Sequence, residues 1–227
     1  MNYYFVLYDD GTHKTHLTKL IESIKKYGSQ FRIIIFSKHN ISKDFYNKHK
    51  HILDLSRGGG YWLWKPYIIL ETLKHINEGD LVFYLDSKYY FLENFDNLFK
   101  PLLENNDIVV WKNKPNEDTY FMKNWCKMDV ILKYDMYQKV FNDNILDCWG
   151  GCIICKKTIK SLNIISSWLE VCCDYNNITD QPSIHKNDTQ FIEHRHDQIL
   201  LSIILHKNNV PLHFLDKKYI QNVRKPF

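Results

Sequence analysis

Short apolar runs and amphipathic stretches alternate along the first half of the chain. The apolar runs predict strands at residues 3–8, 32–37, 80–85 and 108–111. The amphipathic stretches predict helices at residues 15–27, 42–51, 66–76 and 94–99. Strands that alternate with helices are typical of parallel α/β sheets. We therefore expect an α/β fold with a Rossmann-like, mostly parallel central sheet flanked by helices.

The second half has a less regular pattern. It predicts helices at residues 124–133, 137–141, 158–173 and 196–207, strands at 151–155 and 211–215, and a polar loop at 176–191. The apolar stripe of the helix at 158–173 places Trp168 in the core and not against a ligand. No repeat or linker divides the sequence, so we expect one domain over residues 1–227.

Composition narrows the class of protein. A chain of 227 residues with 44% hydrophobic content can bury a substantial core. Its net charge is only +4, with Lys and Arg scattered among acids, so we expect no nucleic-acid groove. No apolar run reaches the roughly 18 residues that span a bilayer, and the first residues lack a signal-peptide pattern. We therefore expect a cytoplasmic protein, at most peripheral to a membrane.

Three of the cysteines lie close together in the sequence. Cys148, Cys152 and Cys155 have a spacing that resembles part of a zinc site. Cys152 and Cys155, however, lie in an apolar strand-like run, where a spacing of three points them to opposite faces. We therefore favour reduced, buried thiols over a metal cluster.

A polar, glycine-rich segment precedes the strand at 80–85. Its three consecutive glycines, at 58–60, allow backbone N–H groups to approach a phosphate closely, and Arg57 and Lys65 place cations on either side. Tyr61, Trp62 and Trp64 are costly to leave exposed, so we expect some of them to line a pocket for a base or sugar ring.

Two further groups of residues carry candidate chemistry. Asp86 ends the strand at 80–85, where it is a candidate for binding a divalent metal or a ribose hydroxyl, or for a helix cap or Asx turn. Asp197 has two candidate roles. It either lies at the cap or in the first turn of a helix, where a carboxylate interacts favourably with the helix dipole, or it acts with Gln198 to stabilise positive charge at an anomeric carbon. His194 and His196 either bind a metal or hydrogen-bond to the backbone, and we favour the second.

Five sequence blocks together resemble small GT-A glycosyltransferases of bacterial polysaccharide clusters and large DNA viruses, and are similar to the chlorovirus rhamnosyltransferase domain. The blocks are SRGGGYWLWKP at 56–66, GDLVFYLDS at 79–87, WCKMD at 125–129, WGGCIICKKT at 149–158 and EHRHDQILLSII at 193–204. The resemblance implies a single-domain GT-A fold that transfers a sugar from a nucleotide-diphosphate donor, by default UDP, to a glycan or other hydroxyl acceptor. It assigns the donor to residues 1–112 and the acceptor to residues 113–227.

The resemblance also implies roles for individual residues. The implied donor-binding residues are Tyr8, Asp9, Arg57, Tyr61, Trp64, Lys65, Asp86, Ser87 and Lys88. The implied acceptor-binding residues are Trp149, Gly150, Gly151, Lys127, Asp129 and His196. Asp197 and Gln198 are implied as a catalytic pair beside the donor sugar, which favours retention of the anomeric configuration.

Lys88 departs from the family pattern. Asp86 and Ser87 match the start of an Asp-x-Asp motif, whose carboxylates hold Mn²⁺ or Mg²⁺, but Lys88 puts a cation at the third position. Three explanations of Lys88 are open. Lys88 points away and Asp86 still binds the metal, or Lys88 replaces the metal in neutralising the diphosphate, or the site is inactive. The last explanation makes the protein a non-catalytic nucleotide-sugar or glycan-binding module. A nucleotidyltransferase is a third possible class of protein. The sequence shows no evident pair of acids for the two-metal reaction of such an enzyme, which disfavours this class.

Overall fold

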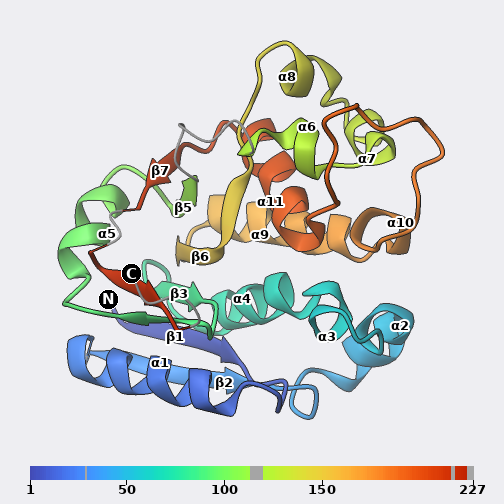
Figure 1. Ribbon diagram of the computed structural model, residues 1–227. Helices are drawn as coiled ribbons and strands as arrows, with labels where there is room; N and C mark the ends of the chain where they lie inside the picture. The colour runs from blue at the N-terminus through green and yellow to red at the C-terminus, as the bar shows by residue number, and fades with distance from the viewer. Residues whose placement is uncertain (29, 113–119, 216–217, 224–227) are drawn as a thin grey trace.

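The central element of the fold is a six-stranded sheet. The computed structural model describes residues 1–28, 30–112, 120–215 and 218–223 (Figure 1). The strands are β1 (Tyr3–Tyr8), β2 (Phe31–Phe36), β3 (Leu81–Leu85), β5 (Ile108–Lys112), β6 (Cys148–Lys156) and β7 (Leu212–Phe214), in the order β2-β1-β3-β6-β5-β7. Only β6 among these six runs antiparallel to its neighbours. The expected mostly parallel sheet is therefore confirmed.

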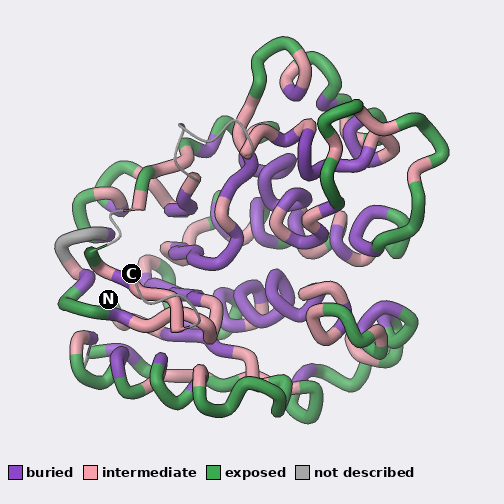
Figure 2. The backbone as a smooth tube through the Cα atoms, viewed as in Figure 1, coloured by how far each residue is buried: buried purple, intermediate pink, exposed green. Residues whose placement is uncertain are grey.

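Helices cover both faces of the sheet (Figure 1). They are α1 (Lys14–Tyr27), α2 (Lys43–Leu53), α3 (Gly58–Tyr61), α4 (Trp64–His75), α5 (Asp96–Leu103), α6 (Met122–Trp125), α7 (Met128–Lys133), α8 (Tyr137–Phe141), α9 (Ile159–Cys172), α10 (Tyr175–Ile178) and α11 (His196–Lys207). The side chains of α4, α9 and α11 pack in one core cluster, and those of α1 and α5 pack in the other. The purple segments of Figure 2 follow the sheet and these helices.

Alternate strand residues contribute to the two clusters, as the period of two in a strand requires. Phe83 lies in the α1/α5 cluster, and Tyr84 lies in the α4/α9/α11 cluster. Cys152 and Cys155 are likewise divided between the clusters, so their predicted opposite orientation is confirmed. Trp168 is completely buried, as its position on the apolar stripe predicts.

The structure differs from the sequence-based expectations in several places. β6 begins at Cys148 and not at residue 151, so the glycines at 150–151 lie inside a strand. The loop expected at 176–191 overlaps the short helix α10. The strands β4 (Tyr89–Phe91) and β8 (Ile220–Asn222) pair with each other in a second small sheet that was not expected, because three residues are too few to show a periodic pattern. Within the described ranges, no helix has the length and apolar character to cross a membrane.

Candidate active site

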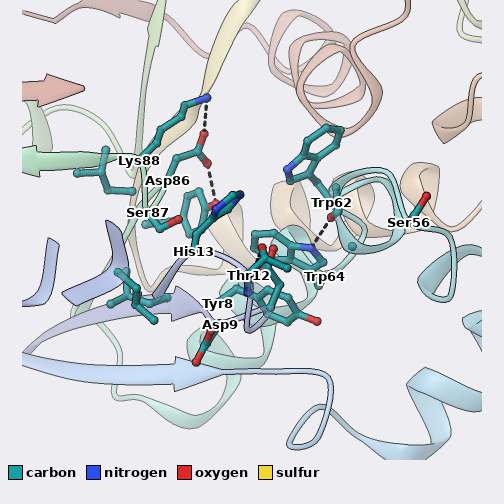
Figure 3. A pocket seen from close by; sticks show the side chains of 17 residues that line it. Tyr8, Asp9, Thr12, His13, Ser56, Trp62, Trp64, Asp86, Ser87 and Lys88 are labelled. Carbon is teal, nitrogen blue, oxygen red and sulfur yellow. Dashed lines mark hydrogen bonds and ion pairs between the residues drawn. The ribbon is translucent and has the colours of Figure 1, made fainter. Parts of the chain in front are cut away.

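A cavity of about 440 Å³ opens at the carboxyl ends of β1 and β3 (Figure 3). This edge of a parallel sheet is where ligands bind in open α/β folds. The residues that line it are Leu7, Tyr8, Asp9, Asp10, Thr12, His13, Leu17, Ser56, Gly58, Gly59, Trp62, Trp64, Tyr84, Leu85, Asp86, Ser87 and Lys88. Six of the nine predicted donor-binding residues are among them, namely Tyr8, Asp9, Trp64, Asp86, Ser87 and Lys88. The cavity therefore brings together residues from two separated sequence blocks and the end of β1.

Two stacked aromatic rings form one wall of the cavity. The rings of Tyr8 and Trp64 have centroids 4.1 Å apart and planes that differ by 7°. The Trp64 indole N–H donates to the carbonyl of Gly58 at 3.0 Å, which fixes the ring against the glycine turn. Burial raises the pKa of Tyr8 to about 12, with a smaller contribution from the nearby Asp10 carboxylate, so the Tyr8 hydroxyl stays neutral. A rigid aromatic wall of this kind suits a planar base or a sugar ring.

The glycine turn before α4 requires its glycines. The backbone has positive φ at every position from residue 58 to residue 62, including Tyr61 and Trp62. At Gly60, with φ of +97°, an added Cβ would lie 2.6 Å from the Leu53 Cα. Backbone strain of this kind persists only where surrounding structure holds it, and here α2 and Trp64 do so. The turn aims Trp62 and Trp64 into the cavity (Figure 3).

Asp86 follows β3 and lies beside two lysine ammonium groups. Its Oδ1 accepts the Tyr84 hydroxyl at 2.7 Å and lies 3.6 Å from the Lys65 Nζ. Its Oδ2 lies 3.4 Å from the Lys88 Nζ (Figure 3). Burial acts to raise the pKa of Asp86, but Lys65, Lys88 and the Tyr84 hydroxyl outweigh burial and lower it. Asp86 is therefore a fixed negative charge on the cavity wall.

Lys65 connects Asp86 to the predicted catalytic residue Asp197. The Lys65 Nζ lies 2.8 Å from the Asp197 Oδ2 and donates to the carbonyl of Gly150 at 3.2 Å. Both charged side chains are only 5% exposed. Burial raises the pKa of Asp197 to about 6, although Lys65 opposes that shift. Neither Lys65 nor Asp197 is among the cavity-lining residues, so Asp86 separates this ion pair from the cavity.

The Gln198 side chain is held at both ends. Its Nε2 donates to the Asp147 Oδ2 at 2.5 Å, and its Oε1 accepts the Gly150 N–H at 3.1 Å. Asp147 is completely buried and also accepts the Ser202 hydroxyl at 2.7 Å. Burial raises the pKa of Asp147 to about 6. Sequence reasoning missed Asp147, because a single acid just before a strand carries no recognisable pattern.

The predicted acceptor-binding residues of β6 lie next to Asp86, Gln198 and Tyr89. The Gly151 carbonyl accepts the Asp86 N–H at 2.8 Å. A Cβ at Gly150 would lie 3.1 Å from the Gln198 Cβ, so glycine lets β6 and α11 approach closely. The Trp149 ring packs edge-on against Tyr89, with centroids 5.0 Å apart.

Arg57 and Tyr61 do not line the cavity. The Arg57 guanidinium binds Asp180 at 3.0 Å and Glu193 at 3.1 Å. The Tyr61 hydroxyl donates to the same Asp180 at 2.8 Å. These contacts join the glycine turn to the segments before α11. The donor-binding roles of Arg57 and Tyr61 stay predictions, because this structure gives both side chains protein partners.

The remaining predicted acceptor residues order the chain between α10 and α11. The Lys127 Nζ donates to the carbonyls of residues 179 and 181, each at 3.1 Å. Asp129 accepts the N–H groups of residues 184 and 185. The rings of His194 and His196 contact the carbonyls of Asn177 and Ile178 at 2.6 and 2.8 Å. Our preference for backbone-bonded histidines is thereby confirmed.

The residues around Asp86 do not fit a divalent cation. Among the described residues, no group of three or more His, Cys, Asp or Glu side chains is placed to hold a metal ion. In this structure Lys88 does not point away from Asp86, because its ammonium lies 3.4 Å from that carboxylate. The assignment of a divalent metal to Asp86 stays a prediction. Two unit charges 4 Å apart near a protein surface interact by about 4 kcal/mol, so the ammonium groups of Lys65 and Lys88 would offset much of the attraction of Asp86 for a dication.

The comparisons with known proteins identify the fold. No protein-family model and no curated protein matches this sequence. The chain is similar to GlyE of Streptococcus pneumoniae, a glycosyltransferase in its apo form, over 96% of this chain and 46% of that one, with a TM-score of 0.51 and 12% identity. It is similar to the bifunctional glycosyltransferase WbbM over 95% of this chain and 39% of that one, with a TM-score of 0.55 and 12% identity. This chain therefore spans less than half the length of either protein.

A third similar structure is core-mannan synthase A of Aspergillus fumigatus in a form with Mn and GDP. It matches over 98% of this chain and 75% of that one, with a TM-score of 0.52 and 10% identity. These likenesses assign the chain the single-domain GT-A fold of glycosyltransferases, as the sequence blocks predict. Membership of a particular bacterial or viral group stays a prediction.

Proposed function

We propose that this protein is a glycosyltransferase that moves a sugar from a nucleoside diphosphate donor to a hydroxyl of a glycan or other acceptor. The cavity is the observation that carries this proposal. It combines the Tyr8 and Trp64 wall with the Lys88 ammonium beside Asp86, at the ligand-binding edge of a GT-A fold. A planar base and a diphosphate in one ligand match this combination.

The contacts support separate roles for the donor-side residues. The base lies against Tyr8 and Trp64 with Asp9 at the rim, and the ribose lies near Asp86 and Ser87. We take UDP as the default donor nucleotide, since no contact among the described residues discriminates between bases. Arg57 and Tyr61 then hold the glycine turn in the shape that presents the aromatic wall.

Asp197 and Gln198 remain the proposed catalytic pair. The Asp197 carboxylate, paired with Lys65 behind Asp86, would contribute from there to stabilising positive charge that develops at the anomeric carbon of the donor. Gln198 binds the Gly150 N–H and so keeps β6 against α11. Retention of the anomeric configuration stays a prediction, and NMR analysis of the product tests it.

The acceptor is proposed to bind on the side of β6 and the segment before α11. Trp149 offers a partly exposed ring against which a sugar could stack. Lys127, Asp129 and His196 contribute by ordering residues 178–185, which would border the acceptor.

Nucleotide release tests the proposal. The purified protein is incubated with UDP-, GDP- and dTDP-sugars, with and without simple glycan acceptors, and the released nucleoside diphosphate is measured. We expect turnover with at least one donor, and a loss of at least about a hundredfold in Asp197→Asn. The matched control is Asp54→Asn, an exposed acid paired with Lys38. Nucleotide binding without release from any donor would instead support the non-catalytic binding module.

A further inference from the structure

We propose that Lys88 performs at this site the task of a divalent metal, so that the diphosphate of the donor binds in the absence of any metal ion. This inference rests on the function proposed above. It concerns which positive charge meets the diphosphate, and it follows from the side chains that surround Asp86.

The position of Lys88 suits this role. Lys88 lines the cavity, and its ammonium lies 3.4 Å from the Asp86 Oδ2 (Figure 3). The side chain is 40% exposed, so it can turn from the carboxylate towards a ligand without moving any packed core residue. Lys65, by contrast, is 5% exposed and is held by Asp197 and the Gly150 carbonyl. Of the two lysines beside Asp86, Lys88 is therefore the one that can reach a diphosphate in the cavity.

The backbone of Lys88 is fixed by the small second sheet. The Lys88 carbonyl accepts the Val223 N–H at 2.8 Å, directly after β8. The next residue, Tyr89, begins β4 and pairs with Asn222 of β8. Because these contacts hold the backbone, Lys88 presents its side chain at the end of the cavity where Asp86 lies. The strands β4 and β8 thus acquire a function in presenting this cation.

The charge balance immediately around Asp86 also favours an anionic ligand without a metal. The carboxylates of Asp86 and Asp197 are already matched by the ammonium groups of Lys65 and Lys88. At Asp86 itself, therefore, no unmatched negative charge is left for a dication; the other two carboxylates that line the cavity, Asp9 and Asp10, directly follow β1. A diphosphate that enters the cavity meets the Lys88 ammonium directly, and a lysine can bind a phosphate as a point charge.

Direct binding measurements test the inference without requiring turnover. Calorimetric titrations with UDP, GDP and dTDP are performed in EDTA and again in MnCl₂. We expect one of these nucleotides to bind with the same affinity in both buffers, within about twofold. Lys88→Ala should weaken that binding at least about tenfold in both buffers, because a charge-assisted contact to phosphate is lost. The matched control Lys100→Ala, which removes a surface lysine paired with Asp96, should bind as the wild type does.

A second variant replaces the cation at position 88 with a potential metal ligand. Lys88→Asp places a carboxylate two residues after Asp86, so its nucleotide binding should be weak in EDTA and should recover in MnCl₂. Wild-type binding that disappears in EDTA and returns with Mn²⁺ would overturn the inference while leaving the proposed function intact. Unchanged binding by Lys88→Ala would also overturn it. Failure of the wild type to bind any of the nucleotides in either buffer would overturn the proposed function as well.

Discussion

Lys65 and Asp197 form an ion pair in the interior of the protein, with 2.8 Å between Nζ and Oδ2. The pair joins the first turn of α4 to the first turn of α11, immediately behind Asp86. Removing one partner of a buried pair leaves the other charge uncompensated, which typically costs more than the pair itself contributes. The contributions of Lys65 and Asp197 to stability therefore depend on each other.

A double-mutant cycle tests this dependence. Lys65→Met and Asp197→Asn should each lower the free energy of unfolding by about 3 kcal/mol. The double variant should lose less than the sum of the two, by an amount on the order of 2 kcal/mol. Urea unfolding measures all three. The exposed pair Lys133 and Asp174 is the control and should give a coupling below about 1 kcal/mol. Additive effects at Lys65 and Asp197 would contradict the contact.

The buried Asp147 predicts a pH dependence of stability. Burial raises its pKa from 3.8 to about 6, so the folded state favours the protonated form. Its stabilising contribution is fully present below pH 3.8 and is lost as the pH rises through about 6. The unfolding free energy of the wild type minus that of Asp147→Asn should thus fall by about 2 kcal/mol between pH 4 and pH 7. A difference that does not change with pH would show that Asp147 titrates normally.

The glycine turn predicts a large effect of one added methyl group. Gly60→Ala should lower the free energy of unfolding by about 3 kcal/mol, because the Cβ would overlap the α2 backbone and the positive φ adds strain. Gly79→Ala is the matched control, since Gly79 also has positive φ but has open space around it. That variant should lose only about 1 kcal/mol. Equal losses in thermal or urea unfolding would contradict the close approach at Gly60.

Much of the sheet and part of the site could be predicted from local sequence. The unbroken apolar run before Asp86 identifies a buried strand and places that carboxylate at the ligand-binding edge. Tyr8 follows from the end of β1 in the same way. These features depend on residues close together in the chain, where period and strand ends carry the information.

The contacts between distant segments could not be predicted. Arg57 and Tyr61 lie beside glycines that suggest a phosphate site, yet both bind Asp180, which is far away in sequence. The role of Asp147 depends on contacts with Gln198 and Ser202 on α11 and with Arg195 just before that helix. The side-chain direction of Lys88 was equally open, because sequence spacing does not reveal which carboxylate an ammonium will face. Tertiary packing decides such partners.

A thermal-shift panel of UDP-, GDP- and dTDP-sugars with the wild-type protein tests the central claim most directly. A ligand that binds only the folded state at a hundred times its dissociation constant stabilises it by about 2.7 kcal/mol. For a chain of this length, that corresponds to a rise in Tm of about 5 to 10 °C. We predict such a rise for at least one donor. No rise with any of them would contradict the assignment of the cavity to a nucleoside diphosphate sugar.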